Sequence, residues 1–140
     1  MPSSAIAGVG TQFTRGDGAS TEEFTPISEV NSITGPGMTR ETIDVTSLDS
    51  TGGYREFIGG FRDGGQVTLN MNFTFDNYVT LLTDFEDDDS HNYQIVLPDT
   101  NNTTLDFAAV VMDMPLSIPT DDKVTIDVTF KITGQVLVTT

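Results

Sequence analysis

Two stretches of this chain alternate strictly between apolar and polar residues. Every odd position of residues 67–75 is apolar and every even one is Thr or Asn, while every even position of 124–132 is apolar and the odd ones are polar. Successive side chains of a β-strand point to opposite faces, so each stretch predicts a strand with one face in the core and the other in water. This pattern predicts a β fold, and 140 residues are enough for one domain with its own core.

Other segments predict a meander of antiparallel strands with one helix. Alternation over 42–48 predicts a half-buried strand, 24–34 predicts a bulged or bent strand around Pro26, and short strands at 93–97 and 105–114 flank a turn at 99–102. After the 66–75 strand, Asp76 is the expected N-cap of a helix of about three turns. Its buried face is expected to consist of Tyr78, Leu81, Leu82 and Phe85. The acidic run 84–89 at its end is expected to be solvated.

Three segments are expected to lie outside this core. Residues 1 to about 18 are rich in Ser, Gly and Thr and predict a mobile arm or a strand that orders only on a partner. The β-prone tail 135–140 is expected to pair with something. A long loop over about 47–65 is the third segment. Its glycines are Gly52, Gly53, Gly59, Gly60, Gly64 and Gly65, and among them stand Tyr54, Arg55, Phe57, Ile58, Phe61 and Arg62. Large apolar side chains on a flexible loop need a packing partner, and a partner chain is one candidate.

Charge and composition exclude several functions. The formal net charge is −15, which opposes tight binding of nucleic acid phosphates or acidic membranes. With no cysteine and only His91, disulfides, thiolate nucleophiles and the common metal triads are excluded, and we expect no cofactor, no metal and no enzymatic activity. His91 is expected at the surface at a strand start. No signal peptide or membrane span is expected.

Two short motifs are better explained without a site. Arg15-Gly16-Asp17 matches the integrin-recognition tripeptide, but a turn is the favoured interpretation. The run from Asp84 to Asp89 begins like a calcium loop, yet it has Asp89 where that loop requires glycine.

A resemblance to a known family is carried by residues 24–75. Residues 24–37 read FTPISEVNSITGPG, residues 40–65 read RETIDVTSLDSTGGYREFIGGFRDGG, and the alternating strand follows. This pattern resembles the major tail tube proteins of bacteriophages with long, non-contractile tails. The resemblance implies a β-sandwich or partly closed barrel flanked by one helix, in a single domain of residues 1–140. It also implies a structural virion protein, assembled in the host cytoplasm, whose hexameric rings stack into a hollow tail tube that delivers DNA.

The resemblance also implies partners and site residues. The partners are other copies of the chain, a tape-measure protein and terminator or tip proteins, with non-specific transit of DNA and no membrane. The 47–65 loop is expected at a subunit or ring interface, and the arm and tail are expected to bridge to other copies. Candidate residues for the lumen are Asp44, Asn70, Asn72 and Asp127. The alternatives are another β-sandwich virion component, either a tail terminator or a head decoration protein, and a small acidic binding module.

Overall fold

The computed structural model describes residues 5–140 of the chain. It is mostly β-structure with one α-helix, as the alternating sequence pattern predicts. The main-sheet strands are β1 (Gln12–Gly16), β2 (Phe24–Pro26), β3 (Val30–Thr34), β6 (Gln66–Asn72), β7 (His91–Val96), β8 (Thr104–Asp113), β9 (Leu116–Ser117) and β10 (Thr125–Thr139). A separate hairpin consists of β4 (Thr39–Asp44) and β5 (Phe57–Asp63), with a short 3₁₀ helix η1 (Thr51–Gly53), and α1 spans Phe75–Glu86.

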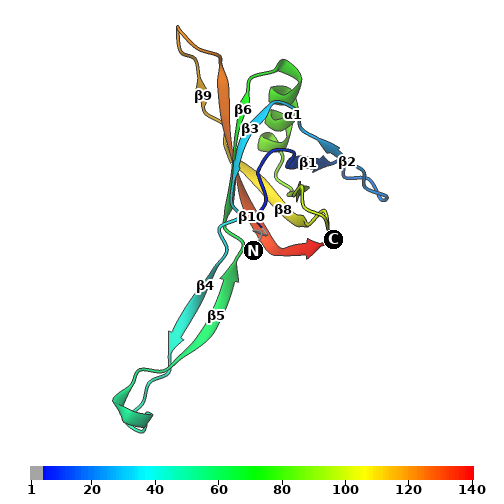
Figure 1. Cartoon of the computed structure of the whole chain (residues 1–140). Coiled ribbons are helices and arrows are strands. Elements are labelled where there is room, and N and C mark those ends of the chain that lie inside the picture. Colours follow the sequence, from blue (N-terminus) through cyan, green and yellow to red (C-terminus); the bar gives the residue numbers. More distant parts are fainter. Residues whose placement is uncertain (1–4) are drawn as a thin grey trace.

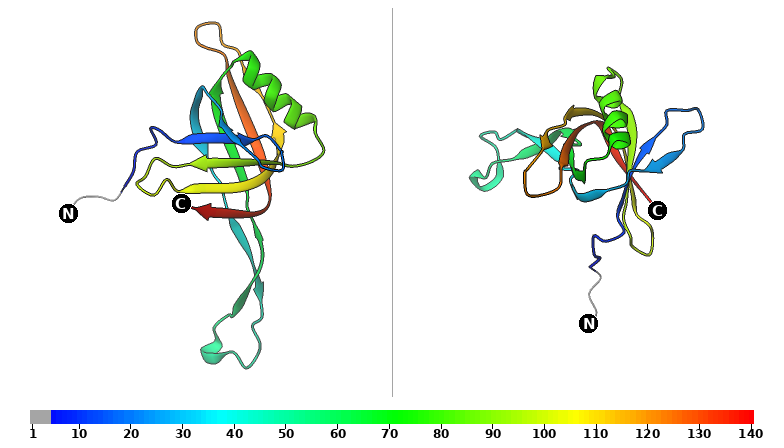
Figure 2. Two further views of the ribbon diagram at one scale, coloured as in Figure 1. Left: turned by 90° about the vertical axis from the view of Figure 1, so that its right-hand side faces the viewer. Right: turned by 90° about the horizontal axis from the view of Figure 1, so that it is seen from above.

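The long strand β10 belongs to both halves of the main sheet. The strand order is β2-β1-β7-β8-β10-β6-β3, with all neighbours antiparallel and with β9 added on β10. The first part of β10 pairs with β6 over residues 125–131, and β10 pairs with β8 from Thr129 to Thr139. The register with β8 shifts between Thr133 and Leu137, where Gly134 has φ 84°. Figure 2 shows β10 changing direction, so that β1, β7 and β8 cross the direction of β3 and β6. A strand that bends between layers produces a crossed sandwich, and the sheet stays open.

The core lies between these two layers and follows the predicted alternation. Val67, Leu69 and Met71 of β6 are fully buried, as are the apolar residues of β10 from Ile126 to Phe130. Phe13 stacks on Phe130 with ring centroids 5.1 Å apart, and Tyr93 lies 4.8 Å from the same ring. The strongest sequence signal therefore identified the central strands correctly.

Both terminal segments are more ordered within the chain than expected. The expected arm 1–18 contains β1, whose Phe13 is only 1% exposed, so the arm is wrong over residues 12–16. Residues 1–4 of the expected arm lie outside the described residues. Residues 135–139 continue β10 and pair with β8 of the same chain, so the expectation of pairing is met without a second copy. The N-terminal composition is polar and rich in glycine, so it gave no sign of a core strand. Phe13 is buried because it packs on Phe130, which is distant in the sequence.

Several boundaries also differ from the sequence prediction. Residues 24–34 form two strands instead of one, interrupted at Glu29, whose φ is 66°. The N-cap of α1 is Thr74, whose hydroxyl accepts a hydrogen bond from the Asn77 amide, so the prediction of Asp76 was wrong by two residues. Leu81 is buried on the inner face of α1, but Phe85 is 44% exposed. The fourth position of the inner face is Asp84 instead, because it has buried polar partners described below.

Candidate assembly interface

A two-stranded hairpin projects away from the main sheet. Strands β4 and β5 pair only with each other among the described strands, and Figure 1 shows them extending to one end of the molecule with η1 at the tip. The expected loop 47–65 is therefore wrong over residues 57–63, which form strand β5, and the irregular part covers 45–56. A long antiparallel ribbon of this kind is marginally stable alone in water.

Glycines shape the base and tip of the hairpin. At the base Gly65 has φ 79°, and a Cβ there would meet the carbonyl oxygen of Gly37. At the tip Gly52 and Gly53 have φ 69° and 73°, which L-residues with side chains rarely adopt. Gly59 and Gly60 lie within β5, where a side chain on Gly59 would collide with the Arg40 guanidinium. The loop glycines identified in the sequence therefore allow the turn at the tip of the hairpin and the close approach of Gly65 to Gly37 at its base.

The apolar side chains of the hairpin are exposed. Phe57 is 55% exposed, Ile58 53% and Phe61 87%, and the side chain of Tyr54 also lies at the surface. Every residue of β4 is exposed too, so the expectation of a half-buried strand over 42–48 fails in the single chain. The alternation of that segment is real, but no layer of this chain covers the hairpin. Apolar side chains that stay exposed together make this hairpin a candidate interaction site.

Ion pairs fix the hairpin at two points. Near the tip, Arg55 Nη1 lies 3.1 Å from Asp44 Oδ2. Hydrogen bonds donated by the hydroxyl and backbone N–H of Thr46 hold the pKa of Asp44 below its usual value, with a smaller contribution from Arg55. At the base, Lys131 Nζ lies 3.0 Å from Asp63 Oδ1. A hydrogen bond from the Gly65 amide, and then Lys131, lower the pKa of Asp63. Because Lys131 is the one base on the polar face of β10, its ion pair with Asp63 joins the hairpin to the sheet.

Polar side chains form a second surface on β3, β6 and β10. Asn70 Nδ2 donates to Asp127 Oδ1 at 2.7 Å, and Asn31 Nδ2 donates to the side-chain oxygens of Asn70 and Asn72, each at 3.0 Å. Asn72 in turn donates to Glu29 at 2.7 Å. The structure therefore brings together three of the four lumen candidates and leaves Asp44 apart on the hairpin. Asn31 and Glu29 were missed by the sequence analysis, because β3 was not expected beside β6.

A buried ionic cluster joins α1 to β1 and β7. The Asp84 side chain is inaccessible to solvent and accepts two hydrogen bonds from Arg15, with Nε to Oδ2 at 2.7 Å, and a third from the Tyr93 hydroxyl at 2.7 Å. Burial and then the Asp84 charge raise the pKa of Tyr93, while the hydrogen bond to Asp84 raises that of Arg15. The expectations of a turn at Arg15 and a solvated acidic cap at Asp84 are both wrong, because each residue supplies the partner that the other needs.

His91 borders this cluster. It begins β7, as expected, and its Nε2 lies 3.0 Å from Asp87 and 3.6 Å from Asp84. Within residues 5–140 there is no group of three or more acidic, His or Cys side chains arranged to hold a metal ion. In the same part of the chain, no helix has the length and apolar character needed to cross a membrane.

The fold is a crossed β-sandwich with one helix, from which an apolar hairpin projects uncovered by the rest of the described chain. The sequence matches the family of the lambda phage tail tube protein (TTP) over residues 7–139, so this chain belongs to that family. It is a structural tail tube protein, located in the virion. The resemblance stated from residues 24–75 is confirmed, whereas a search of curated proteins found no match.

Solved structures with the same fold come from several tail-like particles. A chain from the tail of an empty GTA particle with C6 symmetry is 20% identical, with a TM-score of 0.79 over 97% of this chain and 100% of that one. A chain from the virion of a native gene transfer agent gives 20% identity and 0.76 over the same shares. A chain from the tube-terminating cap of the anti-feeding prophage gives 14% identity and 0.73 over 100% and 94%. At 14–20% identity these likenesses show the shared fold.

Proposed function

We propose that this protein forms hexameric rings that stack into a hollow tail tube for DNA, and that the β4–β5 hairpin makes the contact between copies. The single observation that carries this proposal is the hairpin itself. It extends from the sheet, pairs with no other described strand, and exposes Phe57, Ile58 and Phe61. A second copy of the chain supplies the missing packing partner. The C6 symmetry of the GTA tail supports six copies per ring.

The polar surface of β3, β6 and β10 is the proposed lumen wall. Its hydrogen-bonded side chains are the amides of Asn31, Asn70 and Asn72 and the carboxylate of Asp127. The one base on this face of β10, Lys131, is paired with Asp63 at 3.0 Å. Binding of DNA phosphates depends on free Lys and Arg side chains, so a wall whose one base is already paired lets the duplex slide. Six copies at −15 each reinforce this repulsion. A tape-measure protein inside the tube and terminator or tip proteins at its ends are the further partners in this proposal.

Substitution of the exposed hairpin residues tests the proposal. Phe57→Asp and Ile58→Asp place a charge in the proposed interface, where an unpartnered buried charge costs several kcal/mol. Both variants should remain folded, because each side chain is more than half exposed in the single chain. Negative-stain microscopy and sedimentation of concentrated protein should show tubes or rings for the parent and monomers for the variants.

A matched control comes from the outer surface of α1. Phe85 is 44% exposed, so Phe85→Asp introduces the same charge at a similar exposure outside the hairpin. We expect Phe85→Asp to assemble and both hairpin variants to stay monomeric with unchanged circular dichroism. A parent protein that stays a uniform monomer contradicts the tube, and hairpin variants that polymerise like the parent contradict the role of the hairpin.

A further inference from the structure

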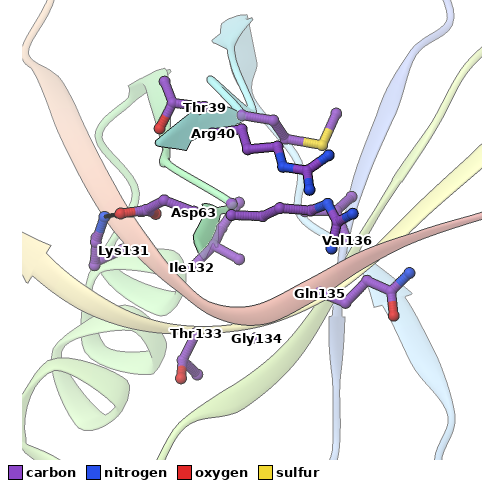
Figure 3. Close-up of a pocket in the computed structure, with 12 residues that line it drawn as sticks. Thr39, Arg40, Asp63, Lys131, Ile132, Thr133, Gly134, Gln135 and Val136 are labelled. Atoms are coloured by element: carbon purple, nitrogen blue, oxygen red, sulfur yellow. Dashed lines mark hydrogen bonds and ion pairs between the residues drawn. The ribbon is translucent and has the colours of Figure 1, made fainter. Parts of the chain in front are cut away.

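A hollow of 940 Å³ lies where the β4–β5 hairpin leaves the sheet. Figure 3 shows its walls: Thr39, Arg40 and Asp63 come from the base of the hairpin, and the segment from Lys131 to Val136 comes from the bend of β10. Met38 and Arg62 also line it. The hollow is therefore formed between the base of the projecting hairpin and the bend of β10.

The charge of this hollow contrasts with the rest of the chain. Arg40, Arg62 and Lys131 line it, which is half of the six Lys and Arg residues in a protein of net charge −15. Lys131 is neutralised by Asp63 at 3.0 Å. Arg40 and Arg62 are direct cross-strand partners, and within residues 5–140 neither has an ion pair.

Two like charges directly opposite each other destabilise an antiparallel ribbon. Arg40 Nε donates a hydrogen bond to the carbonyl oxygen of Gly60, which is long at 3.4 Å. Within residues 5–140 the two opposite arginines are therefore left without a carboxylate partner. A carboxylate from outside the chain relieves this repulsion, and Arg binds carboxylates in a bidentate geometry.

The opposite end of the molecule carries such carboxylates. Strand β9 and the loop 118–124 project away from the hairpin, and Figures 1 and 2 show the two at opposite ends of the long axis. Asp121 and Asp122 in this loop are exposed, and Ile118 is 70% exposed. Lys123 follows them and leaves the loop with a net negative charge. When copies stack head to tail, the 118–124 loop of one copy meets the hairpin of the next, and it reaches the hollow by lying along the hairpin to its base.

We infer that the Arg40–Arg62 hollow of one copy receives the 118–124 loop of the next copy along the tube, with Asp121 and Asp122 pairing with the two arginines. Ile118 brings an apolar side chain to a hollow that Met38, itself 61% exposed, helps to line. This inference rests on the proposed tube and names the residues of its axial contact. A second acidic segment, 86–89, lies at the end of α1 on the flank of the molecule, away from the end that carries the 118–124 loop.

Charge reversal on the two sides tests the pairing. Variant one carries R40E and R62E, and variant two carries D121R and D122R. Either variant alone places like charges at every axial contact, so the concentration needed for tube formation should rise on the order of tenfold. A mixture of the two restores opposite charges at every axial contact of a stack in which the variants alternate, and it should form tubes at close to the parent concentration. The control E86R/D88R should assemble like the parent and should not complement variant one.

The possible results separate this inference from the proposed tube. If the parent forms tubes but both reversed variants assemble equally well, or if E86R/D88R complements variant one in place of D121R/D122R, the axial pairing is refuted and the tube stands. A monomeric parent refutes both. Thermal unfolding of each variant establishes that it is folded before assembly is scored.

A second measurement does not depend on charge. The chain contains no cysteine, so Arg62→Cys with Asp122→Cys introduces its only two thiols. Arg62 lies at the base of the hairpin and Asp122 in the loop after β9 at the far end of the molecule, so oxidation of assembled tubes should produce a ladder of covalent multimers on denaturing gels. Either single-cysteine variant should give no ladder. Tubes of the double variant that yield only monomers after oxidation overturn the inference.

Discussion

Replacement of Asp84 by alanine is the sharpest test of how α1 is held on the sheet. Asp84 accepts hydrogen bonds from Arg15 and from the Tyr93 hydroxyl, and its own side chain is inaccessible. Alanine leaves the Tyr93 hydroxyl without its partner in a residue that is 0% exposed. It also leaves the Arg15 charge, with a quarter of its side chain exposed, without a counter-ion.

The magnitude follows from these surroundings. Breaking a buried ion pair by removing one partner costs about 3–5 kcal/mol. The partial exposure of Arg15 allows water to reach its guanidinium, so we expect the lower end, about 3 kcal/mol. For a domain whose stability is about 5–15 kcal/mol this is a large loss, and it corresponds to a fall in Tm of roughly 10 °C. Replacing both partners with apolar residues, as in Arg15→Met with Asp84→Leu, should cost much less than Asp84→Ala.

Urea unfolding followed by far-ultraviolet circular dichroism measures these differences, because the chain contains no tryptophan. The measurement is made at a concentration where sedimentation shows only monomer, since assembly adds to apparent stability. The m-value should stay constant across the variants, so that the free energies of unfolding can be compared. A loss below about 1 kcal/mol for Asp84→Ala, or a double variant no more stable than Asp84→Ala, refutes the reasoning.

Further predictions concern the ends of the chain, the proposed lumen and the base of the hairpin. Hydrogen exchange of residues 5–11 should slow on assembly, whereas residues 135–139 should already be protected in the free subunit because they pair with β8; equal exchange of 5–11 in the two states contradicts a bridging arm. Asp127→Lys in every copy should make DNA retention in particles strongly dependent on salt, with Asp44→Lys on the hairpin as the comparison, and ejection that is unchanged at low salt places Asp127 outside the lumen. Gly65→Ala should lower the free energy of unfolding by about 1–3 kcal/mol through its positive φ and its contact with Gly37. Gly37→Ala, with open space around the position, should change it by less than about 1 kcal/mol; similar losses for the two variants argue against a strained crossing.

The sequence alone determined which residues form the central strands. Strict alternation fixes which side chains share a face, because the period of a strand is two, and Val67, Leu69 and Met71 are buried as that period requires. It also determined the existence of one helix, and the motif of residues 24–65 determined the family. The apolar segment around Phe57 was correctly identified as unusual, although it was interpreted as a loop.

Only the tertiary structure decided which faces are covered, and by what. A period of two places Ile43 and Val45 on the same side of their segment. It does not show that the hairpin leaves the sheet, or that this side meets no layer of its own chain. Arg15 and Asp84 are 69 residues apart, so local patterns described them as a turn and a solvated cap. Their burial depends on the path of β1 beside β7. Local sequence encodes the period of each element, whereas burial depends on contacts between elements that are distant in the chain.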